Sequence, residues 1–90
     1  MSNSIVTANF TGVGEPALAQ AGAAHIRQRS IVDPALWGLN VDGIAIMFVV
    51  SASGEGYAYI DEGGGVKQQE ALRLVRAIGR VGGRLTSEPT

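Results

Sequence analysis

The sequence predicts an α+β protein of two layers, in which an antiparallel sheet of three to four strands carries two helices on one face. Three observations support this fold class. Short runs rich in β-branched and aromatic residues indicate strands. An alanine-rich stretch and a later amphipathic stretch indicate helices, and Asp42-Gly43 is a strong signal for a β-hairpin. The predicted order is β-α-(β)-β-β-α, with the bracketed strand left open.

The N-terminal part predicts a strand followed by a long helix. Residues 4–10, SIVTANF, are typical of a strand, and Pro16 suits the first turn of a helix, where its missing N–H costs nothing. The alanine-rich residues 16–30 predict that helix, although Gly22 weakens it.

The middle of the chain predicts a meander of strands. Residues 35–41 fit either a short strand or a loop, because Asp33-Pro34 before them signals a turn. After the hairpin signal, residues 44–52 are apolar on both faces, so we expect a central strand that is covered on both sides or buried in an interface. Residues 53–56 predict a tight turn, and residues 57–60 predict the next strand.

The C-terminal part predicts an amphipathic helix over residues 66–81, ended by Gly82-Gly83. Helical periodicity gathers its apolar residues on one core face: Ala71, Leu74, Val75, Ile78, Val81 and Leu85. We expect a polar, flexible tail at about residues 86–90, and one small domain over residues 1–90.

Composition narrows the chemistry. The chain has 90 residues, 46% of them apolar, a formal net charge of −1 and no cysteine. Disulfides, thiolate nucleophiles and cysteine-based metal sites are therefore excluded. The N-terminus lacks the pattern of a signal peptide, and the longest apolar run is too short to cross a bilayer, which needs about 20 residues. We expect a cytoplasmic protein without a membrane partner.

The sequence predicts no enzyme. His25, the only histidine, has no carboxylate at a sequence-local spacing that would orient it as a general base. Serines 30, 51 and 53 lie in no nucleophile-elbow motif. Asp61-Glu62 is the only acidic pair and lacks the pattern of a calcium loop. We expect no catalytic residue, no metal and no cofactor.

A run of glycines is a candidate anion loop. Gly63, Gly64 and Gly65 precede the last helix, where exposed backbone N–H groups and Lys67 could hold a phosphate or carboxylate. The acidic pair just before them would repel an anion, so the sequence favours a flexible connection. Residues 12–16, GVGEP, also precede a predicted helix and allow the same two interpretations.

A basic ridge is the best-defined surface feature. Four arginines are predicted to share one side of the last helix, near the lysine in its first turn: Lys67, Arg73, Arg76, Arg80 and Arg84. The ridge fits a solvated helix face, a docking surface for an acidic protein, or a phosphate-tracking surface on nucleic acid. Tyr57 and Tyr59 alternate onto one sheet face, where they could anchor a protein interface, stack on bases or pack beneath a helix.

The predicted order of helix, three-stranded meander, Gly-rich turn and basic-faced helix resembles the double-stranded-RNA-binding domain. The stretch IAIMFVVSASGEGYAYIDEGGGVKQQEALRLVRAIGRV is similar in layout to the second half of that fold, under half of this chain. The resemblance implies phosphate contacts from lysines at the start of the last helix. Only Lys67 stands there, followed by Gln68, Gln69 and Glu70, so the resemblance concerns topology and not family membership.

These observations favour a small non-enzymatic interaction module or regulator inside the cell, which acts through protein–protein contacts as a homodimer. Its size and lack of catalytic motifs would suit an inhibitor encoded by a phage or mobile element. The alternatives are an RNA-binding domain with an arginine-faced helix, and a protein that binds a small anionic or phosphate ligand.

Overall fold

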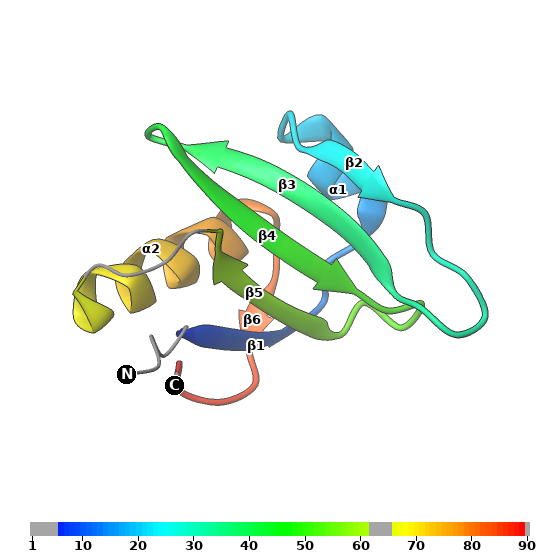
Figure 1. Cartoon of the computed structure of the whole chain (residues 1–90). Coiled ribbons are helices and arrows are strands. Elements are labelled where there is room, and N and C mark those ends of the chain that lie inside the picture. Colours follow the sequence, from blue (N-terminus) through cyan, green and yellow to red (C-terminus); the bar gives the residue numbers. More distant parts are fainter. Residues whose placement is uncertain (1–5, 62–65, 90) are drawn as a thin grey trace, which may run out of the picture.

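A computed structural model describes residues 6–61 and 66–89, and it contains a six-stranded antiparallel sheet with two helices (Figure 1). The elements in chain order are β1 (Thr7–Thr11), α1 (Glu15–Gln20), β2 (Ala24–Arg27), β3 (Ala35–Val41), β4 (Ile44–Val50), β5 (Gly56–Ile60), α2 (Lys67–Arg80) and β6 (Arg84–Leu85). The strands lie in the order β2-β3-β4-β5-β1-β6. The α+β class fits this architecture, but the predicted sheet of three to four strands is wrong, because β2 and β6 add a strand at each edge.

Both helices pack on the same face of the sheet (Figure 1). Leu18 of α1 and Leu74 and Ile78 of α2 are fully buried against the strands. The strand residues of this single core alternate along each strand: Ala8 and Phe10, Ala35, Trp37 and Leu39, Ile46, Phe48 and Val50, Ala58 and Ile60. We call the opposite side of the sheet the outer face.

The predicted hairpin is confirmed, and it settles the state of residues 35–41, which form β3. Asp42 and Gly43 both have positive φ, 53° and 80°, as a type I′ turn requires. Asn40 accepts a hydrogen bond at its Oδ1 from the Gly43 N–H, 3.0 Å away. The turn fixes a register that runs without a break from Val41 opposite Ile44 to Ala35 opposite Val50.

The predicted helix over residues 16–30 is wrong beyond its first turns. Pro16 lies in the first turn of α1 as expected, but α1 ends at Gln20. Gly22 takes a φ of 90°, which reverses the chain. Residues 24–27 then pair antiparallel with β3 as β2. Alanine-rich composition predicts helix only as a weak preference, and pairing with β3 overrides it.

The last helix is confirmed as α2, and so is its glycine stop. The Gly83 N–H donates to the Ile78 carbonyl and the Gly82 N–H to the Gly79 carbonyl, which is a Schellman motif with Gly82 at a φ of 80°. Because the helix stops there, Arg84 and Leu85 form β6 and pair with β1. The prediction that Leu85 continues the core face of the helix is therefore wrong, and its side chain is exposed; Val75, predicted on the same face, is also exposed.

Gly56 marks the tightest backbone approach in the core. A Cβ on this residue would lie 1.8 Å from the Val49 carbonyl oxygen and 3.2 Å from the Phe10 ring. Only glycine fits between the start of β5 and the neighbouring β4. Gly79, near the end of α2, has no atom within 4 Å of the same position.

We expect Gly56→Ala to lower the free energy of unfolding by at least about 2 kcal/mol, because the new methyl group overpacks the core. Gly79→Ala adds the same methyl group to a helix in open space, so we expect it to raise the free energy of unfolding by up to about 1 kcal/mol. Urea denaturation followed by circular dichroism measures both. Equal effects of the two substitutions would contradict this account of Gly56.

Candidate functional site

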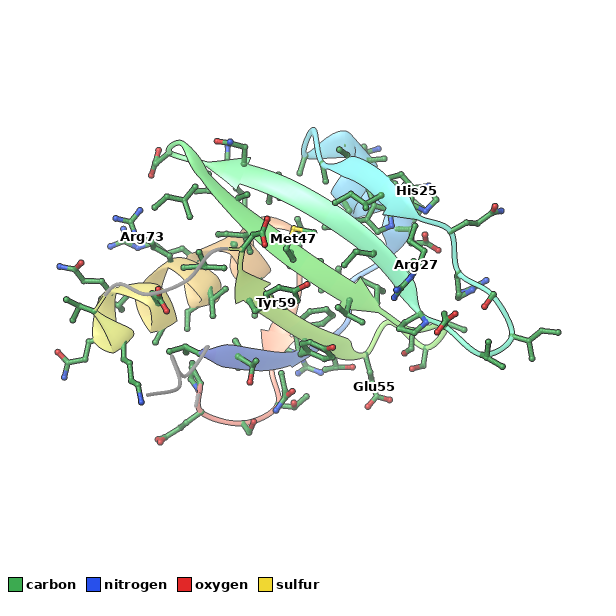
Figure 2. All side chains as sticks on the ribbon, viewed as in Figure 1. His25, Arg27, Met47, Glu55, Tyr59 and Arg73 are labelled. Carbon is green, nitrogen blue, oxygen red and sulfur yellow. The ribbon has the colours of Figure 1, made fainter. Side chains whose placement is uncertain are left out.

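The outer face carries no charged residue on the strands between the two sheet edges. Strand alternation assigns the following residues to it: Thr7, Asn9 and Thr11 of β1, Leu36, Gly38 and Asn40 of β3, Ala45, Met47 and Val49 of β4, and Tyr57 and Tyr59 of β5. The view in Figure 2 looks onto this face, with Met47 and Tyr59 near its middle. No helix among the described residues covers it.

Neighbouring side chains shield the middle of this face. Met47 and Val49 are only 9% and 8% exposed, although both helices lie on the other side of the sheet. Met47 lies opposite Tyr59 in the register of β4 with β5, and Val49 lies opposite Tyr57. From the other side, Ile26 lies over Gly38, where a Cβ would meet its Cδ1 at 3.0 Å and the Met47 sulfur at 3.6 Å. The result is an apolar strip across β2, β3, β4 and β5.

The two tyrosines lie on the outer face, on the side away from the helices. Their ring centroids are 6.1 Å apart with the planes 30° from parallel. Tyr57 is exposed and Tyr59 is half-buried. The sequence placed them on one face, and the structure shows that this is the uncovered face and not the one beneath a helix.

Both edges of the sheet are poor templates for another strand. β2 carries a bulge between His25 and Arg27, and β6 has only two residues, one of them Arg84. Bulges, short edge strands and edge cations are the devices by which proteins prevent edge-to-edge pairing. A partner of this sheet is therefore more compatible with its face than with its edges.

The structure divides the predicted basic ridge. Lys67, Arg76 and Arg80 are exposed on α2, and Arg73 is half-buried on the same helix. Arg84 belongs to β6, so its predicted place on the helical ridge is wrong. A hollow of about 300 Å³ beside the helix is lined by Arg73, Arg76 and the acidic Asp42 of the β3–β4 turn. A carboxylate at this position opposes the binding of phosphate groups to these two arginines.

His25 has partners that the sequence did not reveal. Its Nε2 lies 3.7 Å from Oε1 of Glu15, and its ring stacks on Trp37 with centroids 4.3 Å apart. The same Glu15 oxygen accepts a hydrogen bond of 3.0 Å from Trp37 Nε1. The sequence predicted that His25 lies on a helix. In the structure it lies on β2, and the pairing of β2 with β3 places it over Trp37.

The predicted anion loop, Gly63 to Gly65, lies outside the described residues. Within residues 6–61 and 66–89, no three His, Asp or Glu residues are grouped closely enough to hold a metal ion. In the same part of the chain, no helix has the length and apolar character needed to cross a membrane. Searches of protein-family models, curated proteins and solved structures found no match to this chain.

The contact of Glu15 with Trp37 should stabilise the fold. We expect Glu15→Ala to lower the free energy of unfolding by about 1–2 kcal/mol, because it leaves the partly buried Trp37 N–H without its acceptor. Glu15→Gln keeps an acceptor oxygen and should change stability by less than about 0.5 kcal/mol. Since Trp37 is the only tryptophan, its fluorescence in a urea titration reports both variants directly. Equal losses in the two variants would show that the charge matters and not the hydrogen bond.

Proposed function

We propose that this protein is a small non-enzymatic interaction module that acts through protein–protein contact, and that the outer face of its sheet associates with a second copy of the chain. The single observation that supports this most is the composition of the outer face. Its strands between the edges combine apolar and aromatic side chains with uncharged polar ones and carry no charge. Interface cores are likewise depleted of charged residues and enriched in tyrosine and methionine.

The absence of charge also indicates the kind of partner. A strongly acidic or basic protein would lose the hydration of its charges on this face without gaining an ion pair. A second copy presents an equally uncharged surface, so neither partner buries an unpaired charge. Self-association through one shared patch is also the commonest form of protein assembly.

Charges around the patch favour the same partner. Arg27 on β2 pairs in register with Leu36 of the outer face, and Arg84 on β6 pairs with Thr11, so each sheet edge carries a cation. Glu55 lies just before β5 and Asp61 just after it. Each is two residues from a tyrosine, so both lie on the same face as Tyr57 and Tyr59, and the two ends of that strand carry anions. Suppose that a second copy packs its outer face on the first, with its strands nearly perpendicular to those of the first copy. The basic edges of each sheet then approach the acidic ends of β5 in the other. Orthogonal packing is one of the two standard arrangements of stacked sheets.

Tyr57→Glu tests the proposed association. We expect the unmodified protein to be a dimer in analytical ultracentrifugation at micromolar concentration. The variant should weaken the dimer about a hundredfold, because an unpaired carboxylate in the interface costs about 3 kcal/mol or more. A monomer of the unmodified protein at this concentration would refute self-association.

Leu72→Glu is the matched control. Leu72 is 57% exposed on α2, and Tyr57 is 41% exposed on the outer face, so both substitutions replace an exposed apolar group with a carboxylate. Only Tyr57 lies on the proposed interface, so the Leu72 variant should remain a dimer. Circular dichroism of both variants separates loss of association from loss of fold.

RNA binding through α2 is the alternative, and it has less support, since Arg84 leaves the ridge and Asp42 lies beside Arg73 and Arg76. We expect no saturable binding of a labelled duplex RNA at low salt, where contacts to phosphate are strongest. Tight binding that weakens steeply with salt would contradict this expectation. Loss of that binding in Arg73→Glu/Arg76→Glu would then assign it to α2.

A further inference from the structure

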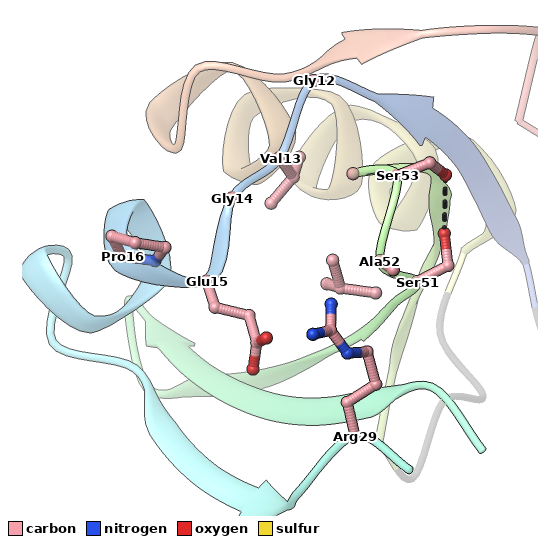
Figure 3. A pocket seen from close by; sticks show the side chains of 11 residues that line it. Gly12, Val13, Gly14, Glu15, Pro16, Arg29, Ser51, Ala52 and Ser53 are labelled. Atoms are coloured by element: carbon pink, nitrogen blue, oxygen red, sulfur yellow. Dashed lines mark hydrogen bonds between the residues drawn. The ribbon is translucent and has the colours of Figure 1, made fainter. Parts of the chain in front are cut away.

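A pocket of about 350 Å³ opens at one end of the sheet, on the same side as the helices (Figure 3). Its walls come from the segment between β1 and α1, the loop after β2 and the turn between β4 and β5. Pro16 and Ala52, both exposed, give its walls apolar groups, and Val13 and Val50 lie buried beneath them. Its volume falls within the range of about 300–1,000 Å³ that is usual for small-molecule sites.

Two opposite charges face each other across this pocket. The carboxylate of Glu15, at the start of α1, and the guanidinium of Arg29, in the loop after β2, both extend into it (Figure 3). They do not form an ion pair with each other: Glu15 Oε1 lies 3.7 Å from His25 Nε2, and Arg29 has no carboxylate within ion-pair distance among the described residues. Glu15 Oε1 accepts from Trp37, which fixes the carboxylate and leaves Oε2 without a partner in the described part of the chain. A fixed anion and an unpaired cation therefore border one cavity of mixed polar and apolar lining.

The hydroxyl groups of the third wall are already engaged. Ser51 Oγ donates to the Glu55 carbonyl at 2.8 Å and lies 3.0 Å from Ser53 Oγ. The two serines thus hold the shape of the turn, and the charged groups available to a ligand are the carboxylate and the guanidinium. Arginine binds carboxylates with two parallel hydrogen bonds, and a carboxylate accepts charge-assisted hydrogen bonds from an ammonium group.

We propose that this pocket binds a small zwitterion, namely a free α-amino acid with an apolar side chain. Arg29 binds its carboxylate, Glu15 Oε2 accepts from its ammonium group, and the exposed Pro16 and Ala52 contact its side chain. A simple anion would meet the Glu15 carboxylate, and a simple cation would meet Arg29. Only a ligand with both charges satisfies both groups.

Amide resonances of isotope-labelled protein measure this binding, with glycine, L-alanine, L-valine and L-leucine as probes near neutral pH. We expect saturable shifts for at least leucine, centred on Gly12, Gly14 and Ser53 of the pocket wall. 4-Methylpentanoate lacks the ammonium group of leucine, and L-leucinamide lacks its carboxylate. Each should bind about tenfold more weakly or worse, since each loses one charge-assisted contact.

Substitutions locate the site. Arg29→Gln and Glu15→Gln should each weaken leucine binding about tenfold or more, and Glu15→Gln keeps the acceptor for Trp37. Arg76→Gln on α2 removes an exposed arginine outside the pocket and should leave binding unchanged. The proposal is overturned if none of the four amino acids gives saturable shifts, if either leucine analogue binds as tightly as leucine, or if Arg29→Gln has no effect.

Discussion

The rest of the structure depends on the burial of β4 on both sides in a protein that has helices on one side only. One side of β4 packs into the core with Phe48 fully buried, and the other side points Met47 and Val49 away from the helices. These two side chains stay out of water because Tyr57 and Tyr59 flank them on one side and Ile26 and Leu36 on the other. β2 is thus needed for the outer face and not only for the width of the sheet, since Ile26 lies over Gly38 beside Met47.

Local signals predicted the elements that local chemistry determines. The Asp42-Gly43 turn needs positive φ at two adjacent residues, and α2 needs an apolar stripe and a glycine stop, so both are visible in the sequence. β2 and β6 form only by pairing with strands that are distant in sequence or follow a loop. Residues 24–27, AHIR, hold one β-branched residue in four and follow an alanine-rich stretch, so their own strand preference is weak, and a strand of two residues has no periodicity to detect.

The same distinction applies to the candidate sites. Alternation alone put both tyrosines on one face, but which layer covers that face depends on where the helices pack. The contacts among Glu15, His25 and Trp37 join three different elements, α1, β2 and β3. No spacing rule reveals such a cluster when the middle element is itself predicted to be a helix. The opposed charges of Glu15 and Arg29 were hidden for the same reason, because Arg29 lies within residues 16–30, which were predicted to form one helix.

The distribution of charge separates the outer face from an ordinary solvated face. An antiparallel sheet with one side in water usually alternates apolar and polar residues, with charges on the wet side. The described residues include charges, but these lie on α1 and α2, in the loops and turns and at the sheet edges, away from the inner strands of the outer face. Its edges are also blunted by the bulge in β2 and the shortness of β6. Edge pairing, which adds chains without limit, is therefore disfavoured. Contact between two outer faces instead uses the single outer face of each copy, so the assembly stops at two copies. An uncharged face between protected edges thus fits a finite assembly better than either a solvated surface or open-ended aggregation.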